Sequence, residues 1–207
     1  MVDEATEQAE EAMRSEWAAG DFEAVTTAAL RLYGPELLGF LVSMHRDYDA
    51  ASEAFSLFSE RLWQSIRRFE WGCSLRGWCY RLARNAAIDV IRLERRGRHV
   101  SLSSAPEVFK LAAQVRTTTI SAMRSEKRSA LERLRDELSE EDRSVLVLRV
   151  DRALEWREVA LILSGGSAEQ ERLLEGEALK RETARLRKRF QLTVDRLRTL
   201  ARERGLL

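Results

Sequence analysis

The stretch from Phe69 to Arg98 combines arginine side chains with aromatic rings, and this combination suits a surface that holds nucleic acid. Residues 61–98 contain ten arginines against only three acids, Glu70, Asp89 and Glu94. Guanidinium groups can neutralise phosphates, and flat aromatic rings can stack on unpaired bases. The segment therefore predicts a site for a polyanion that includes unpaired bases.

A helix that begins near Ser74 would place this chemistry on one side. Apolar residues recur at three- and four-residue steps and predict a face that enters a core. That stripe is Leu75, Cys79, Leu82, Ala86, Val90 and Leu93. The candidate nucleic-acid contacts are Trp78 at the boundary, Arg81, Arg84, Asn85, Ile88, Arg92 and Arg95 on the opposite face, and Tyr80. The alternative is a core helix in which Trp78 and Tyr80 only pack.

A second basic block lies at residues 179–207, where ten Lys or Arg face three acids. A short helix, a turn with glycines and then a basic helix is typical of a helix-turn-helix, whose second helix enters the major groove of DNA. The inward stripe is expected to be Leu179, Thr183, Leu186, Phe190, Val194, Leu197 and Ala201. The outward face then carries Lys180, Arg181, Ala184, Arg185 and Lys188. A merely solvated charged face is the alternative.

The elements that position these residues are predicted to be helices. The 207 residues include only 2 prolines and 10 glycines, and alternating patterns of strand type are nearly absent. We expect an all-α chain of two small helical domains. The net charge of +1 hides a strong segregation along the sequence, because residues 1–23 hold eight acids and a single arginine. Two basic blocks suggest two contacts with one polyanion.

The predicted helices define the domains. The first domain has helices over 21–32, 36–45 after Gly34 and Pro35, 51–69 and 74–97. A Ser- and Thr-rich linker with at most one helical turn follows. In the second domain, helices are expected at 121–138, from Glu140 after a capping box at Ser139 to Asp142, at 155–163 and at 179–204. The domains are an acidic extension at 1–23, a first domain at 24–98, a linker at 99–120, and a second domain at 121–207 with an acidic insertion at 164–178.

Several classes of function are excluded by absent motifs. Cys73, Cys79, His45 and His99 match no zinc spacing and give no disulfide framework, so we expect no metal and no cofactor. No phosphate-cradling glycine loop or nucleophile motif occurs, and this argues against an enzyme. The N-terminus does not read as a secretory signal, and no apolar run is long enough to span a membrane. We therefore expect a cytoplasmic protein that has no contact with a membrane.

The order of these segments resembles the extracytoplasmic-function class of bacterial sigma factors, the promoter-recognition subunits of RNA polymerase. SLRGWCYRLARNAAIDVIRLERR at 74–96 is the most specific match. LYGPELLGFL at 32–41 and DYDAASEAFSLFSERLWQSI at 47–66 resemble the rest of region two. The likeness to region four lies in LSEEDRSVLVLRV at 138–150, EWREVALIL at 155–163 and LKRETARLRKRF at 179–190.

The resemblance implies a protein that binds core RNA polymerase and recognises and melts promoter DNA. The helix at 74–96 would open the minus-ten element and capture an extruded base, and the basic helix from residue 179 would bind the minus-thirty-five element. The resemblance also implies that the linker runs through the polymerase, and an anti-sigma factor is a possible partner because members of this class are often held by one. The polymerase contacts are expected at Glu53, Ser56, Leu57, Glu60, Arg61 and Trp63.

The sequence departs from the family pattern at two places. Ser52 and Glu53 stand where the family usually has an acidic pair, and residues 164–178 lengthen the turn of the helix-turn-helix, which is typically about 3 to 4 residues. Two other functions stay open. One is a stand-alone helix-turn-helix regulator of duplex DNA, and the other is a helical adaptor that binds no DNA. The acidic N-terminus and the acidic insertion are candidates for control.

Overall fold

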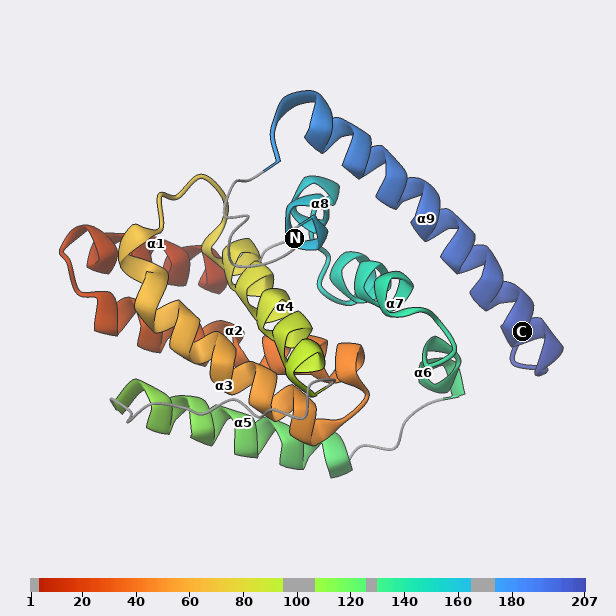
Figure 1. Ribbon diagram of the computed structural model, residues 1–207, viewed down its shortest axis with the longest axis horizontal. Coiled ribbons are helices and arrows are strands. Elements are labelled where there is room, and N and C mark those ends of the chain that lie inside the picture. Colours follow the sequence, from red (N-terminus) through yellow and green to blue (C-terminus); the bar gives the residue numbers. More distant parts are fainter. Residues whose placement is uncertain (1–3, 95–106, 126–129, 165–173) are drawn as a thin grey trace. The chain divides into compact units, whose positions relative to one another are not determined.

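The computed structural model describes residues 4–94, 107–125, 130–164 and 174–207. Within these ranges the regular elements are helices and none is a strand, which confirms the all-α prediction. The chain divides into unit 1, residues 1–122, and unit 2, residues 123–207 (Figure 1). Unit 1 contains α1 (Glu4–Ala18), α2 (Phe22–His45), α3 (Tyr48–Ser65), a 3₁₀ turn (Ile66–Arg68), α4 (Leu75–Glu94) and most of α5 (Glu107–Ser125). Unit 2 contains α6 (Ala130–Arg135), α7 (Glu140–Leu146), a π-helical turn (Val147–Asp151), α8 (Trp156–Leu163) and α9 (Gly176–Glu203).

The core of unit 1 lies among α2, α3 and α4. Asp21 and Asp47 begin α2 and α3, because each carboxylate accepts hydrogen bonds from backbone N–H groups of the first turn. Large aromatic and aliphatic side chains fill the space between the helices, and removal of this apolar surface from water stabilises the unit. The fully buried ones include Phe40, Phe55, Phe58, Leu62, Ile66 and Tyr80.

One helix, α2, replaces the two helices that Gly34 and Pro35 had suggested. Proline removes one backbone donor and usually starts or kinks a helix. Here Leu30, Leu37 and Leu38 are fully buried on either side of the proline. Packing therefore holds both halves of α2 in one helix, a tertiary effect that local propensity does not contain.

The acidic N-terminal residues differ from the expected separate extension, because α1 is part of unit 1. Met13 of α1 is 1% exposed, and the Tyr33 hydroxyl donates a 2.5 Å hydrogen bond to Glu10. Trp17 donates its indole N–H to the carbonyl oxygen of Ile66 at 2.8 Å. Apolar anchors of α1 therefore outweigh the repulsion among its acids.

The predicted linker at 99–120 also differs from the structure. Residues 107–125 form α5, a helix of 19 residues, instead of at most one turn. Val108 and Ala112 are 1% and 5% exposed, and Val115 follows one turn later on the same side. This apolar spacing was the signal available in the sequence, and the Ser and Thr residues around it obscured it. Residues 99–106 of the predicted linker lie outside the described residues.

In unit 2, α7 begins where the sequence predicts. Ser139 caps α7 by accepting a hydrogen bond from the Asp142 backbone N–H at 3.2 Å, which confirms the helix start at Glu140. After the π-helical turn, Ala153 takes a left-handed conformation with φ of 53°, and α8 follows. Leu148, Val159, Ile162 and Leu186 form the centre of the core. Within the predicted helix at 121–138, residues 121–125 belong to α5 and Ala130–Arg135 form α6, whereas residues 126–129 lie outside the described residues. Most of the insertion at 164–178 lies outside the described residues.

Candidate nucleic-acid interface

Helix α4 presents a wider buried face than the periodicity alone predicts. Leu75, Cys79, Ala86 and Val90 are fully buried as expected. Leu82 and Leu93 of the predicted stripe are only half-buried. The additional fully buried residues are Tyr80, Ala83 and Ala87. Since α2 and α3 both pack on α4, its buried arc covers more than one stripe.

The predicted contact residues of α4 fall into two groups. Tyr80 is 0% exposed and lies 5.4 Å from Phe40, centroid to centroid, in an edge-on packing. Arg81 is 9% exposed. These two residues are part of the packed helix face, so we remove them from the candidate DNA contacts. The others remain at the surface, with Trp78, Arg84, Asn85 and Ile88 half-buried and Arg92 exposed. Arg95 lies outside the described residues.

Trp78 is held by a second ring. It stacks on Phe69 with a centroid distance of 4.8 Å and an interplanar angle of 30°. Phe69, which ends the 3₁₀ turn, is 4% exposed and is therefore anchored in the core. Trp78 itself is half-buried, so part of the indole faces outward. A base can stack on such a ring without a rearrangement of the ring, since Phe69 already restrains it.

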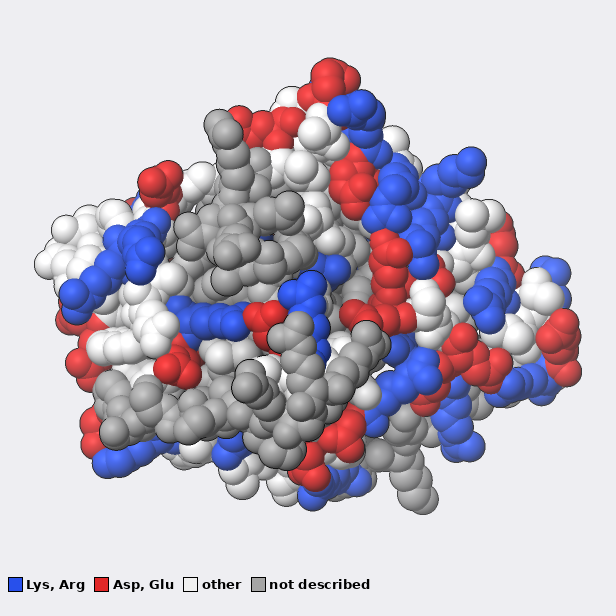
Figure 2. Space-filling view, in the orientation of Figure 1, with Lys and Arg blue, Asp and Glu red and all other residues white. Residues whose placement is uncertain are grey.

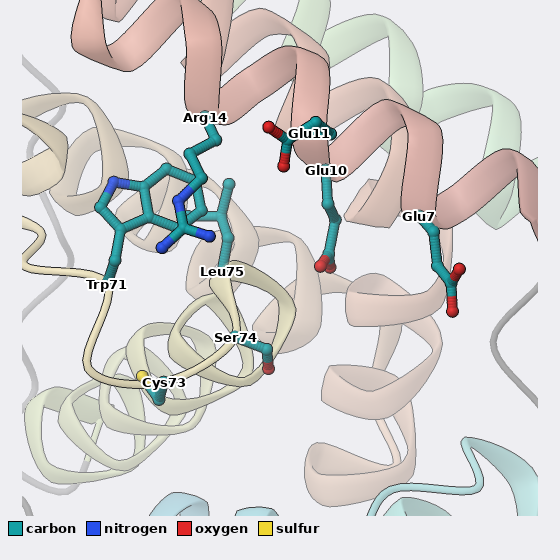
Figure 3. A pocket seen from close by; sticks show the side chains of 8 residues that line it. All are labelled: Glu7, Glu10, Glu11, Arg14, Trp71, Cys73, Ser74 and Leu75. Carbon is teal, nitrogen blue, oxygen red and sulfur yellow. The ribbon is translucent and has the colours of Figure 1, made fainter.

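The aromatic contacts continue from Phe69 into the loop before α4 and into α1. Phe69 contacts Trp71 at 4.9 Å, and Trp71 contacts Trp17 at 6.2 Å. The Arg14 guanidinium lies 5.0 Å from the Trp71 ring centroid, within cation–π range (Figure 3). The sequence pattern indicated the aromatic character of the segment that begins at Phe69, but it did not connect this segment to Arg14 and Trp17 of α1, for which the aromatic residue at 17 was the visible signal.

Trp71 occupies a strained conformation. Its φ is 55°, in the left-handed region that bulky residues rarely adopt, and such a residue costs of order 1 to 3 kcal/mol. Its indole N–H is buried and has no hydrogen-bond acceptor among the described residues. Beside it is a cavity of about 240 Å³ between α1 and the start of α4 (Figure 3). The cavity is lined by Glu7, Glu10, Glu11, Arg14, Trp71, Cys73, Ser74 and Leu75.

Several arginines on or near α4 form ion pairs with carboxylates. Arg76 donates two hydrogen bonds to Glu36, at 2.8 and 2.7 Å. Asp89 accepts from Arg61 at 2.7 Å and lies 3.5 Å from Arg92. Arg76 therefore ties α4 to α2, and Arg61 ties α3 to α4. Arg92 is half exposed and only weakly held, so it stays available to a phosphate.

The residues expected to bind polymerase lie along α3 and are all half-buried: Glu53, Ser56, Leu57, Glu60, Arg61 and Trp63. Among them, Arg61 and Ser56 contact other helices of unit 1. Arg61 forms its ion pair with Asp89, and Ser56 accepts a 2.8 Å hydrogen bond from Arg116 of α5. The partly exposed α3 surface thus already contacts two other helices.

The outward face of α9 carries the second basic surface. Its predicted inward stripe is buried or half-buried throughout, from Leu179 to Ala201. All five predicted contacts, Lys180, Arg181, Ala184, Arg185 and Lys188, are exposed. Figure 2 shows some acidic side chains among the basic ones in the area of this helix, and Glu177 and Glu182 are the acids of α9 near the predicted contacts. The surface is therefore mixed in charge and is not a continuous cationic stripe.

Two of these cations are engaged by acids. Lys180 pairs with Glu177 at 2.7 Å. Arg185 pairs with Glu141 of α7 at 2.6 Å and with Glu182 at 2.8 Å. Hydrogen bonds to Glu182 and Glu141 raise the pKa of Arg185. No ion pair occurs within the described residues for Arg181 or Lys188, so these two are the least compensated cations of the predicted set.

A polar cluster fastens α9 to α7. The Asp142 carboxylate accepts hydrogen bonds from Arg189 at 2.6 Å and Thr193 at 3.0 Å, and the Ser139 hydroxyl lies 2.6 Å from its other oxygen. Partial burial raises the pKa of Asp142, but these hydrogen bonds outweigh that effect and lower the pKa below its ordinary value. The ionised carboxylate therefore stabilises the orientation of α9.

Trp156 at the start of α8 is a second aromatic centre. Its ring packs edge-on against Phe190 at 5.4 Å. The guanidinium groups of Arg149 and Arg187 lie 5.3 and 5.9 Å from its centroid. Arg187 is exposed and adds a cation beside the predicted surface of α9.

The described residues contain no group of three or more His, Cys, Asp or Glu side chains placed to hold a metal ion. None of the helices in the described ranges has the length and apolar character needed to cross a bilayer.

Comparison with protein families independently supports the assignment of a functional surface to α4. Residues 29–97 match the family model of Sigma-70 region 2, a span that runs from the middle of α2 through α4 and includes Phe69, Trp78 and Arg92. A search of curated proteins and a search of solved structures gave no match. Proteins with this region bind core RNA polymerase and promoter DNA and are not enzymes. The match thus supports a sigma factor of the sigma-70 family that acts in promoter recognition and transcription initiation.

Proposed function

We propose that this chain is a sigma factor of the extracytoplasmic-function class, which acts in the cytoplasm and directs core RNA polymerase to specific promoters. The observation that carries the proposal is the coincidence of the region 2 match with the aromatic and cationic surface of α4. Unit 1 would bind polymerase and the minus-ten element, and unit 2 would bind the minus-thirty-five element. An anti-sigma partner is an expectation of the family resemblance alone.

Promoter opening would follow from differential binding. An unpaired base stacks on the partly exposed Trp78, whose ring Phe69 holds in place. Arg84 and Arg92 attract the backbone of the same strand, and both lie at the surface of α4. A duplex offers no unstacked base to Trp78, so these contacts favour open DNA over closed DNA.

Upstream duplex DNA would contact the outward face of α9. Arg181 and Lys188 are exposed and uncompensated among the described residues, and Ala184 between them permits close approach of the helix backbone to the groove. Arg185 and Lys180 contribute less, because carboxylates already balance their charges. Exposed Arg187 joins the set.

Polymerase would dock along α3. Leu57 and Trp63 offer apolar surface there, and Glu53 and Glu60 offer carboxylates. Mixed apolar and charged residues at a half-buried helix face suit a protein partner better than a polyanion, since the carboxylates would repel phosphates. Because α3 packs beside α4, polymerase docked on α3 would hold its DNA close to Trp78.

The test is transcription with purified core polymerase on a library of genomic fragments. A start site that appears only when this protein is added supports the proposal. Tight binding to one duplex without polymerase, with no start site, would favour a stand-alone regulator. Absence of DNA binding even with polymerase would favour a protein adaptor.

A further inference from the structure

Helix α5 packs on α2 through a contact that only glycine permits. A Cβ atom at Gly34 would lie 2.8 Å from Cγ1 of Val115 and 3.5 Å from Cζ of Phe55. Glycine inside a helix costs about 1 kcal/mol relative to alanine. Close approach of α5 supplies a physical reason for glycine at this position.

A polar contact fastens the same helix to α3. Arg116 Nη1 donates a hydrogen bond to Ser56 Oγ at 2.8 Å. Val108 and Ala112, on the same side of α5, are almost completely buried. Figure 1 shows α5 running alongside α3 within unit 1. Helix α5 therefore covers part of the α3 surface.

Ser56 belongs to the set of residues to which we assign polymerase binding. A polymerase subunit and α5 cannot both contact the Ser56 hydroxyl side of α3. We propose that α5 is a self-masking element, which covers this part of α3 in the free protein and leaves it when core polymerase binds. The inference rests on the proposed function of α3.

The composition of α5 suits a reversible contact. Its docking side uses the small side chains of Val108, Ala112 and Val115 with one neutral-to-charged hydrogen bond, and its opposite side is polar, with Gln114, Thr117 and Thr118 exposed. The free energy of burial scales with the apolar area removed from water, so Ala112 and the half-buried Val115 hold α5 less strongly than fully buried leucines would, whereas buried Val108 holds it more firmly. The apparent affinity for polymerase then depends on the fraction of molecules with α5 released.

A disulfide can test the proposal by locking α5 in place. The Cβ position of Gly34 lies 3.8 Å from Cβ of Val115, within the range of about 3.5 to 4.5 Å that disulfides require. The double variant Gly34→Cys, Val115→Cys also removes the methyl group that crowds position 34. Cys73→Ser is included in every protein compared, because Cys73 is half-buried. Burial raises the pKa of the Cys79 thiol, which keeps it protonated and unreactive.

Binding of the double variant to core polymerase is measured after oxidation and again after reduction. We expect the apparent Kd to rise at least about tenfold on oxidation and to return on reduction. The single variant Val115→Cys, treated with the same oxidant, should bind equally in both states. Equal affinity of the locked and reduced double variants would overturn the inference and leave the proposed function intact. Failure of the unmodified protein to bind polymerase would overturn the proposed function itself.

Hydrogen exchange gives a second test without new cysteines. Amides of residues 107–122 should lose protection when core polymerase binds, because α5 leaves unit 1. Arg116→Ala, which removes the hydrogen bond to Ser56, should lower this protection in the free protein and tighten polymerase binding severalfold. Full protection of α5 in the polymerase complex would contradict the inference.

Discussion

The two basic surfaces, on α4 and on α9, are built in opposite ways. On α4 most of the candidate contacts are half-buried, and Trp78 is braced by Phe69 of the core, whereas Arg92 is exposed. On α9 they are exposed along a long helix, and acids balance part of their charge. A braced ring suits selection of one unpaired base, whereas an exposed rod suits contact with the groove and backbone of a duplex. The contrast indicates that packing determines the geometry of the α4 surface, whereas charge determines the binding properties of the α9 surface.

The largest effect is expected at the braced ring. Trp78→Ala should reduce promoter opening about 30-fold, since base stacking on an aromatic ring contributes about 2 kcal/mol. Opening is measured by the reactivity of unpaired thymines at the promoter, and polymerase binding is measured in parallel. Trp78→Phe retains a ring and serves as the matched control, which should lose much less. Equal loss of opening and of initial polymerase binding would contradict a base-holding role.

The next effect concerns the clasp that orients α9. Asp142→Asn should destabilise unit 2 by about 1.5 kcal/mol at pH 7, because hydrogen bonds from Arg189 and Thr193 lose their charged acceptor. The folded-state pKa of Asp142 is lowered, so its contribution is present above the unfolded pKa and is lost as pH falls through the folded pKa.

Thermal unfolding from pH 7 down to pH 3 checks this prediction. The unmodified protein should lose stability below about pH 4, near the ordinary pKa of an Asp side chain. The variant should show a shallower loss over the same range. Parallel curves for the two proteins would show that Asp142 contributes nothing to the orientation of α9.

The smallest effect distinguishes two neighbouring arginines of α9. Arg181→Ala should lower the salt slope of duplex binding by about one, the change expected when one phosphate contact is lost. Arg185→Ala should change the slope less, because Glu141 and Glu182 already neutralise that cation. Both slopes come from binding titrations of the polymerase complex on upstream duplex at several salt concentrations. A larger change for Arg185 would reverse the assignment and place its guanidinium on DNA.

Local patterns predicted the helices well where packing agrees with them. The Ser139 cap marked the start of α7, and the stripe of α9 from Leu179 to Ala201 is inward as expected. The same reasoning failed at Pro35 and at residues 107–125. In both places the deciding interactions come from residues distant in sequence, such as Phe55 and Val115 beside Gly34. A pattern within one segment contains no information about such partners.

The candidate sites show the same difference between local patterns and contacts of residues distant in sequence. Periodicity placed Arg181, Ala184 and Lys188 on the outer side of α9 because one face of that helix remains in solvent. It misplaced Arg81, and Tyr80 packs in the core as the alternative interpretation had it, since α4 packs against two helices and buries a wider arc than one stripe. The contacts of Trp71 with Arg14 and Trp17 join segments far apart in the chain.

The sequence by itself determined the helical class, the segregation of charge into an acidic start and two basic blocks, and the residue types able to hold a strand of DNA. These properties depend on composition and on spacing within single helices. Only the tertiary structure decided which arginines are exposed or paired, which ring braces Trp78, and where α5 lies on unit 1. The physical reason is that burial and ion pairing depend on neighbours that the fold brings together.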